Sequence, residues 1–244
     1  MCLVIVAVDV SRRYPLMIAA NRDEQHARPA TAAAWWADRP QLFAGRDLAA
    51  GGTWLAVDRR GRLAAVTNIR ESRREVAPRS RGALVTEFVA GQDSAAAYAA
   101  RAARDGPEYG AFNLLLHDGR ELHYSSNRAA PAALGAGLHA FSNAPREVEW
   151  PKLASARAAV LRVAGEEAPI EPLFAMLAER GPDGTGEERY RTAHFVVGRN
   201  YGTRCSTVVL IASSGHVTVA ERTFDSGGRP SGETRETFGV AAPG

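Results

Sequence analysis

Apolar residues begin the chain and recur in short runs separated by turn-forming residues. Residues 3–10 and 16–20 are apolar and rich in β-formers, and the segment 11–15, which ends in Pro15, separates them. This pattern predicts a β-hairpin. Its second strand runs into the tetrapeptide Asn21-Arg22-Asp23-Glu24, so we expect the hairpin to bring these four residues beside the start of the chain.

The rest of the chain alternates between strand-like and helix-like patterns. Helical spacing predicts helices over residues 82–90, 94–104, 150–163 and 169–180, and strands are expected at 55–57, 63–68, 112–117, 121–125, 138–142, 193–199, 204–212 and 215–224. The segment 181–189 is glycine-rich and acidic, which is typical of a loop. From about residue 226 the composition is rich in Gly, Ser and Pro and predicts a partly mobile C-terminal tail.

This order of elements constrains the fold class. Strands dominate both ends of the chain, helices come in pairs, and tight turns join most neighbouring strands, which argues against a parallel βαβ sheet. We therefore expect an α+β fold: a four-layer αββα sandwich of two mostly antiparallel sheets. A length of 244 residues is compatible with a single domain spanning 1–244.

Composition narrows the classes of function. The net charge is only +3, and basic residues are not interleaved with aromatic ones, so no nucleic-acid partner is expected. No apolar run is long enough for a membrane span, and the first run lacks the features of a signal peptide, which predicts a cytoplasmic protein. The two cysteines, Cys2 and Cys205, form neither a metal-binding pattern nor a disulfide framework, and no cofactor is expected from them.

Cys2 is the strongest candidate for chemistry. Removal of Met1 would leave a residue with a thiol and a free α-amine, and an α-amine titrates near pH ~7.7–8.0, so it can act as the base for its own side chain. The alternative is structural, because Cys2 precedes an apolar run and cysteine is often a small buried hydrophobic residue.

Motifs along nearly the whole chain resemble one known family. The tetrapeptide Asn21-Arg22-Asp23-Glu24 is the one that names the NRDE family, also called the Transport and Golgi organisation family. Further motifs resemble those of the family in the same order: Met1-Cys2, Arg28-Pro29, Gly45-Arg46-Asp47, Gly51-Gly52-Thr53-Trp54-Leu55, Thr67-Asn68, Ser80-Arg81-Gly82, Phe112-Asn113-Leu114, Ser142-Asn143, Trp150-Pro151-Lys152, Tyr201-Gly202-Thr203-Arg204 and Glu221-Arg222.

A more distant resemblance concerns the chemistry. The layout is similar to the bile-salt and penicillin V acylases, which are N-terminal nucleophile hydrolases with an αββα fold. By motif, this resemblance implies that Cys2 is the nucleophile and that Asp23 orients its α-amine. It also implies that Asn68 and Asn143 form the oxyanion hole and that Arg204 matches the family's late arginine. The chain has Ala20 where these acylases have an arginine, so the electrostatic support of the thiol differs.

Two functions of different classes follow from these resemblances. The first is a cysteine amidohydrolase or thioesterase that cleaves an acyl amide or thioester, with substrate contacts expected from Asn21, Arg22, Glu24 and Trp54. The second is a non-catalytic protein for haem trafficking or for acyl-lipid or acyl-CoA binding, which the family resemblance implies. An inactive relative of the hydrolases that acts as an interaction partner is a third alternative. The partner is thus a small acyl molecule or haem, and the oligomeric state is left open.

Overall fold

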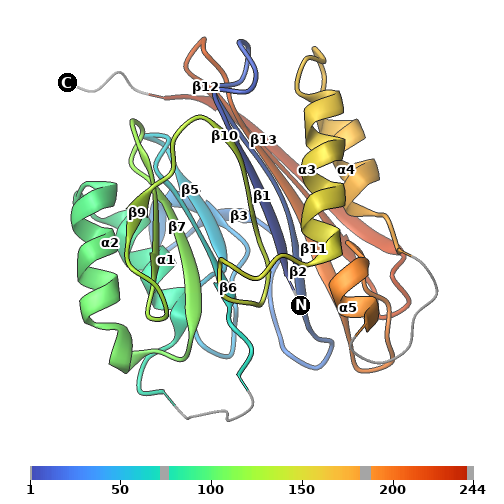
Figure 1. The fold of residues 1–244 in the computed structure, drawn as a ribbon, viewed down its shortest axis with the longest axis horizontal. Coiled ribbons are helices and arrows are strands. Elements are labelled where there is room, and N and C mark those ends of the chain that lie inside the picture. The colour runs from blue at the N-terminus through green and yellow to red at the C-terminus, as the bar shows by residue number, and fades with distance from the viewer. Residues whose placement is uncertain (1, 72–76, 182–187, 241–244) are drawn as a thin grey trace. The chain divides into compact units, whose positions relative to one another are not determined.

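The computed structural model describes residues 2–71, 77–181 and 188–240. The contacts between residues divide the chain into two compact units that are interleaved in sequence (Figure 1). The first unit contains Met1–Ala27, Ala136–Ser142 and Glu147–Gly239, and the second contains Arg28–Gly135, Asn143–Arg146 and Val240–Gly244.

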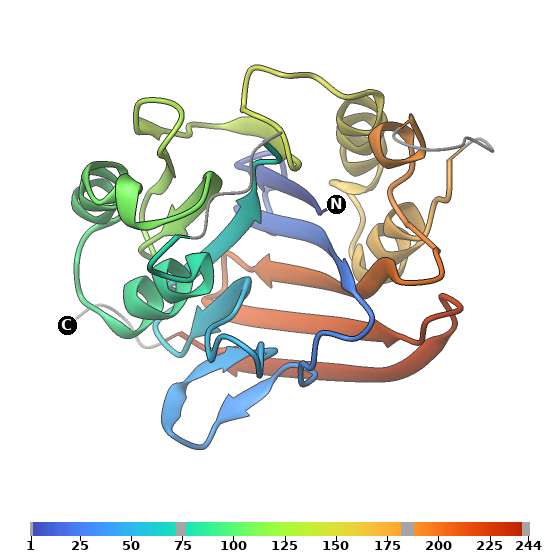
Figure 2. The ribbon, with the colours of Figure 1, turned by 90° about the horizontal axis from the view of Figure 1, so that it is seen from below.

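The first unit is an antiparallel six-stranded sheet with helices on one face (Figure 2). Its strands follow the order β10 (Gly137–Phe141), β1 (Leu3–Val8), β2 (Leu16–Gln25), β11 (Tyr201–Ile211), β12 (His216–Phe224) and β13 (Pro230–Gly239). Helix α3 (Pro151–Val163) packs on β1 and β10, and α4 (Ile170–Leu177) packs on β2 and β11. A short helix, α5 (Glu188–Thr192), precedes β11.

The predicted N-terminal hairpin is confirmed. Strand β1 pairs with β2 from Leu3 opposite Asn21 to Val8 opposite Leu16. Asp9 begins the turn with φ 53°, and its amide donates to the Pro15 carbonyl at 2.8 Å. Strand β1 lies between β10 and β2, and its residues Leu3 to Ala7 are buried; this interior position fixes where the chain start lies in the sheet.

The second unit is an antiparallel seven-stranded sheet covered by two helices. Its strands run in chain order as β3 (Ala34–Trp36), β4 (Arg39–Ala44), β5 (Leu55–Asp58), β6 (Leu63–Asn68), β7 (Phe112–His117), β8 (Leu122–Ser126) and β9 (Ala132–Ala133). Helices α1 (Arg81–Ala90) and α2 (Ala95–Arg104) are followed by the 3₁₀ turn η1 (Gly106–Glu108). The two helices were expected at nearly these positions.

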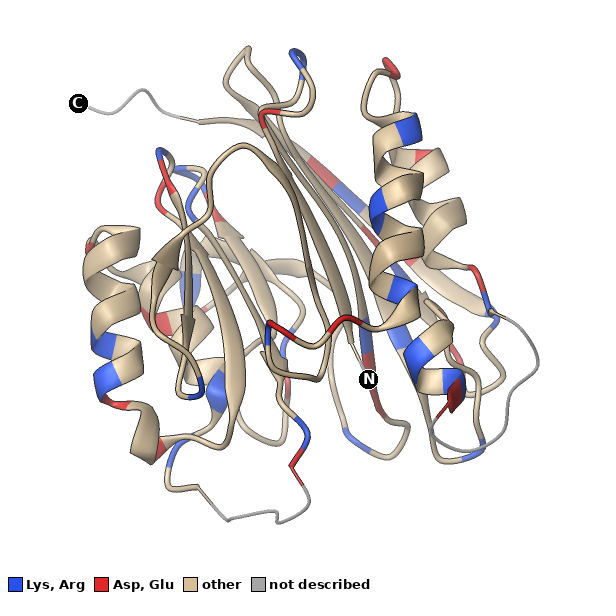
Figure 3. Cartoon of the chain, viewed as in Figure 1, with Lys and Arg blue, Asp and Glu red and all other residues tan. Residues whose placement is uncertain are grey.

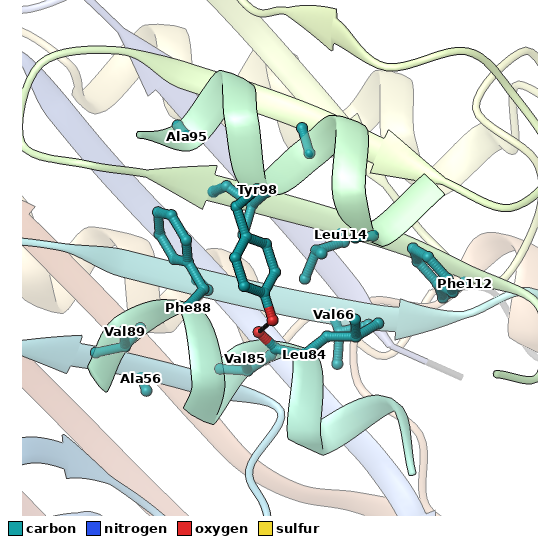
Figure 4. Packing of buried hydrophobic residues seen from close by; sticks show 14 of the residues in the cluster. Ala56, Val66, Leu84, Val85, Phe88, Val89, Ala95, Tyr98, Phe112 and Leu114 are labelled. Carbon is teal, nitrogen blue, oxygen red and sulfur yellow. Dashed lines mark hydrogen bonds between the residues drawn. The ribbon is translucent and has the colours of Figure 1, made fainter. Parts of the chain in front are cut away.

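The core of the second unit lies between this sheet and its helices (Figure 4). Alternate strand residues such as Val66 and Leu114 meet the apolar faces of α1 and α2. The rings of Phe88 and Tyr98 pack edge to face with centroids 5.1 Å apart, a favourable aromatic geometry. The buried Tyr98 hydroxyl donates to the Leu84 carbonyl at 2.9 Å, so its one polar group is satisfied.

Two of the glycine motifs meet through their backbones in this unit. A Cβ at Gly52 would lie 2.7 Å from the backbone carbon of Gly82, and a Cβ at Gly82 would lie 3.0 Å from the carbonyl oxygen of Thr53. Gly82 is the second residue of α1, whose N-cap Ser80 accepts from the Gly82 amide. The absence of side chains therefore lets the Gly51–Thr53 turn rest directly on the start of α1.

The structure confirms the α+β class with two antiparallel sheets. It differs from the sequence expectation at several segments, among them residues 193–199 and the segment from residue 226. Residues 193–199, expected as a strand, form no strand: the amides of His194 and Phe195 both donate to the Glu179 carbonyl. Ala193, His194, Phe195 and Val196 are all buried, so the apolar character of this segment reflects packing in the core without strand pairing.

The C-terminal segment from residue 226 contains a strand that its composition does not reveal. Strand β13 pairs with β12 over nearly its whole length, from Pro230 opposite Phe224 to Gly239 opposite His216. Its residues are mostly polar on both faces, so hydrophobic periodicity gives no sign of it. The mobility expected for this segment stays a prediction.

Candidate functional site

Cys2 lies where the hairpin register places it. It directly precedes β1, and the pairing of Leu3 with Asn21 sets it beside Arg22 and Asp23. The residue as a whole is partly exposed, and its sulfur lies 4.0 Å from the backbone carbonyl oxygen of Asp23. Met1, whose removal the proposed chemistry requires, is outside the described residues. Figure 3 shows the basic and acidic positions that adjoin one another at this end of β2.

The carboxylate of Asp23 is fixed by its neighbours on β11. Its Oδ1 accepts a hydrogen bond of 2.7 Å from the Thr203 hydroxyl, which in turn accepts from the Val196 amide at 2.9 Å. The Tyr201 hydroxyl donates to the Asp23 carbonyl at 3.0 Å. Asp23 is only 5% exposed, so its carboxylate acts at short range in a region with little water.

The electrostatics of the thiol follow from this environment. Burial raises the pKa of the Cys2 thiol, the Asp23 carboxylate raises it further, and the Arg22 guanidinium acts in the opposite direction. Burial also raises the pKa of the Tyr201 hydroxyl, which therefore remains a hydrogen-bond donor. A thiol in such surroundings is protonated at rest and needs a nearby base before it can attack a substrate.

Strand alternation separates the other residues of the tetrapeptide. Asn21 is fully buried, and its amide donates to the carbonyls of Leu177 and His194, both at 2.8 Å. Its side-chain oxygen accepts from the Ser206 hydroxyl at 2.6 Å. Asn21 was expected to contact substrate, but the structure uses both of its amide protons to attach β2 to α4 and to the segment before β11.

Arg22 and Glu24 lie on the opposite face of β2 from Asn21 and Asp23. Arg22 forms an ion pair with Glu24 at 4.0 Å. The expectation that alternation turns Arg22 away from Asp23 therefore agrees with the geometry.

Lys152 was not assigned a role from the sequence, yet it lies beside Cys2. It is the only lysine in the chain and is 0% exposed. Its ammonium is 3.5 Å from the Cys2 carbonyl oxygen. The composition of the chain could have pointed to this residue. The other 29 lysine or arginine positions are all arginines, and the single lysine lies in the motif Trp150-Pro151-Lys152.

Arg204 occupies a β-bulge where β11 shifts register against β2. Its guanidinium donates to the carbonyls of Gln25 and His26 at 3.0 and 3.2 Å. These bonds bind the arginine to the end of β2, two residues beyond Asp23. The structure therefore gives Arg204 a part in shaping the end of the strand that carries the tetrapeptide.

The two predicted oxyanion residues belong to the second unit and lie together. Asn68 ends β6 with an exposed side chain, and Asn143 follows β10 by two residues. The Asn143 amide donates to the Asn68 carbonyl at 2.7 Å, and the Arg70 amide donates to the Asn143 carbonyl at 2.9 Å. Trp54, the expected substrate contact in this unit, is partly buried and joins the sheet through its carbonyl, which accepts from Val66.

A buried network holds the segment that carries Asn143. The Asn113 amide donates to the Thr67 hydroxyl at 3.1 Å and to the Ala144 carbonyl at 2.9 Å, and its oxygen accepts from the Tyr124 hydroxyl at 2.9 Å. Asn113 thus joins β6, β7 and β8 to the residue that follows Asn143. Its motif was recognised from the sequence, but this role was not.

Within residues 2–71, 77–181 and 188–240, no group of three or more His, Cys, Asp or Glu side chains is arranged to hold a metal ion. Over the same residues, none of the helices has the length and apolar character needed to cross a membrane.

Comparisons with known proteins identify relatives of the whole chain. The sequence profile described as Transport and Golgi organisation 2 matches residues 1–226. A Transport and Golgi organization protein 2 homolog from Bos taurus is 34% identical over 257 aligned positions, covering 92% of this chain and 93% of that protein. The homolog from Homo sapiens is 32% identical with the same coverage.

Solved structures resemble the fold at low sequence identity. The C2A mutant of a conjugated bile acid hydrolase from Clostridium perfringens matches with a TM-score of 0.54 and 7% identity, covering 98% of this chain and 92% of that chain. A Caenorhabditis elegans N-acylethanolamine-hydrolyzing acid amidase ortholog matches with a TM-score of 0.50 and 10% identity, covering 86% and 92%. These likenesses confirm the predicted fold of the N-terminal nucleophile hydrolases.

Proposed function

This chain belongs to the Transport and Golgi organisation 2 family, and from that premise we propose that it hydrolyses an acyl amide or acyl thioester with Cys2 as the nucleophile. One observation carries the proposal: Cys2 is a partly exposed residue at the start of a buried interior strand, and its sulfur lies 4.0 Å from the backbone carbonyl oxygen of a buried aspartate. A cysteine that served only as core would be sealed among apolar side chains.

The chemistry begins with exposure of the α-amine of Cys2 by removal of Met1. The amine accepts the thiol proton, and the thiolate attacks the substrate carbonyl carbon to form a tetrahedral intermediate. Collapse of the intermediate breaks the bond to the leaving group, which departs as an amine or thiol after taking the proton from the α-ammonium. Water, activated by the same amine, then cleaves the thioester and releases the carboxylic acid.

Asp23 has the role of fixing the α-amine. Its carboxylate is held in one orientation by Thr203, and its backbone is held by Tyr201. A fixed anion next to an amine favours the ammonium form, so it stabilises the charge that develops when the amine takes the thiol proton. Arg204 supports the same strand end through Gln25 and His26.

Asn68 and Asn143 have the role of oxyanion donors. Each asparagine amide carries two N–H donors, and in Asn143 the bond to the Asn68 carbonyl engages one of them. The remaining donors are the kind of group that stabilises a developing oxyanion.

The names of the structural neighbours support this substrate class. One is named as an acid amidase that hydrolyses N-acylethanolamines, and the other as a hydrolase of conjugated bile acids in which residue 2 was changed from Cys to Ala. Both names describe hydrolysis of an acyl conjugate. We propose the same reaction class for this chain, with the acyl group and the leaving group to be identified by experiment.

The decisive measurement is the intact mass of the purified protein before and after exposure to an activated acyl ester. We expect a mass lower by one methionine residue, a single acyl adduct mapped to Cys2, and no adduct in Cys2→Ala. Cys205→Ser is the matched control, because Cys205 is buried and has no part in the proposed reaction. In this variant the acyl adduct on Cys2 should form as in the wild type.

Two results would reject the proposed reaction. Retention of Met1 would remove the internal base, and acylation of Cys2→Ala at the wild-type level would exclude Cys2 as the nucleophile. Stoichiometric haem binding by Cys2→Ala, together with no acylation of the wild type, would favour the carrier function instead.

A further inference from the structure

We propose that Lys152 is a positioning residue for Cys2. Its buried ammonium holds the Cys2 carbonyl and supplies a positive charge that promotes ionisation of the Cys2 thiol. This inference rests on the proposed role of Cys2. Lys152 acts through Cys2 and need not touch the substrate.

The position of Lys152 is energetically unfavourable for a charged amine, for two reasons. The residue is the second of α3, after the N-cap Trp150, so its ammonium adds to the positive end of the helix dipole. It is also fully buried, which disfavours a charged amine. A cation that is retained despite these two unfavourable effects is expected to have compensating partners and a functional role.

The compensating groups are those of the candidate site. The Lys152 ammonium lies 3.5 Å from the Cys2 carbonyl and 5.3 Å from the centre of the Trp150 ring. Burial lowers the pKa of Lys152, while the negative charges of Asp23 and ionised Cys2 raise it. Further titratable or charged groups on the neighbouring elements include Arg22 and Glu24 on β2, Tyr201 on β11, Tyr190 on α5, and His194, which lies near the Lys152 carbonyl.

The first turn of α3 is held firmly enough for such a role. The Lys152 carbonyl accepts from the Ser155 hydroxyl at 3.1 Å and lies 3.2 Å from Nε2 of His194. Nδ1 of His194 bonds to the Met176 carbonyl at 2.8 Å, and the His194 carbonyl accepts from Asn21. Asn21 of the tetrapeptide thus supports the helix end that carries Lys152.

The expected effect of the charge has a definite sign. Asp23 opposes ionisation of the thiol because like charges repel, and a lysine cation nearby offsets that opposition. The interaction is reciprocal: if Lys152 favours the thiolate, the thiolate must favour the charged form of Lys152. Ionisation of Cys2 should therefore be visible at Lys152.

The sole lysine allows this coupling to be measured without a mutation. Protein labelled with [13Cε]lysine should give one side-chain NMR signal, from Lys152. We expect that signal to move over the pH range in which Cys2 becomes reactive toward iodoacetamide, and the movement to disappear once Cys2 is alkylated. A signal that titrates identically before and after alkylation would overturn the proposal.

Variants provide an independent measurement in a Cys205→Ser background, where Cys2 is the only thiol. In Lys152→Met the midpoint of the pH–alkylation profile should rise by roughly one unit, and Lys152→Arg should restore part of the shift by returning the charge. Ser155→Ala is the matched control, because it removes the hydrogen bond to the Lys152 carbonyl and keeps the cation. It should lower the melting temperature and leave the midpoint unchanged.

These outcomes separate the inference from the proposed function. An unchanged midpoint in folded Lys152→Met would reject the role of Lys152 whether or not the protein turns over a substrate. If Lys152→Met does not fold, the NMR titration of the wild type decides alone. A wild type that shows the coupling but forms no acyl adduct would reject the hydrolase and retain the Lys152–Cys2 coupling.

Discussion

At the scale of single residues, the tetrapeptide 21–24 combines architecture with chemistry. The Asn21 amide donates hydrogen bonds to the carbonyls of Leu177 and His194. On the same face of β2, the Asp23 carboxylate accepts a hydrogen bond from Thr203. Arg22 and Glu24 pair on the other face. Loss of Asn21 should therefore destabilise the fold, whereas loss of Asp23 should change the reactivity of Cys2.

The first prediction concerns Asp23→Asn. Burial and the Asp23 carboxylate both raise the pKa of the Cys2 thiol, so removal of this charge should lower the midpoint of the pH–alkylation profile by roughly one unit. Turnover of an acyl substrate should fall, because in the proposed mechanism this carboxylate anchors the α-amine. Iodoacetamide kinetics across pH provide the measurement. Glu167→Gln removes an exposed carboxylate as the control, and a midpoint that stays fixed or rises in Asp23→Asn would contradict the prediction.

At the scale of elements, Asn113 connects three strands to the segment that carries Asn143. Asn113→Leu would leave the Tyr124 hydroxyl and the Ala144 carbonyl without their partner in a buried region. We expect a loss of about 2–4 kcal/mol in the free energy of unfolding, measured with urea. Tyr124→Phe, which removes one hydroxyl of the same network, should cost about 1 kcal/mol. Equal costs for the two variants would show that the network does not act through Asn113.

The contact between the Gly51–Thr53 turn and α1 leads to another prediction at this scale. Gly52→Ala places a methyl group 2.7 Å from the Gly82 backbone, so either the turn or the helix start must shift. We expect a loss of about 2 kcal/mol or more in the free energy of unfolding, typical of steric overlap at a backbone contact. Gly135→Ala, where the added Cβ meets no atom within 4 Å, should stay within about 0.5 kcal/mol. A similar value for both variants would count against the close approach.

At the scale of the whole molecule, β13 extends the six-stranded sheet beyond residue 226, where the family match ends. A chain truncated after residue 226 would expose the β12 edge and lose the ion pair between Arg222 and Glu233. We expect a lower melting temperature and aggregation, because unpaired strand edges associate. Thermal unfolding with light scattering measures both effects, and truncation after residue 240, which keeps β13, is the control. Equal behaviour of the two truncations would mean that β13 adds nothing to the sheet.

The sequence predicted the parts of this molecule that depend on local chemistry. The hairpin turn and the alternation of β1 and β2 placed Cys2 beside Asp23, and helical spacing located α1 to α4. Contacts between residues far apart in the chain could not be predicted from the sequence. The hydrogen bonds of Asn21, for example, join it to residues more than 150 positions away. Lys152 was missed because a lysine is expected at the surface, and only tertiary packing shows that it is buried.

The place of β1 in the sheet also has a practical meaning for anyone who handles this protein. Its first buried residue, Leu3, immediately follows the thiol, and strands on both sides flank it. Under the proposed mechanism, an affinity tag or fusion partner joined to the amino end would convert the free amine of Cys2 into a peptide bond, and the folded preparation would be inactive. Tags are better placed at the carboxyl end, beyond β13, or ahead of a protease site that releases Cys2 as the first residue.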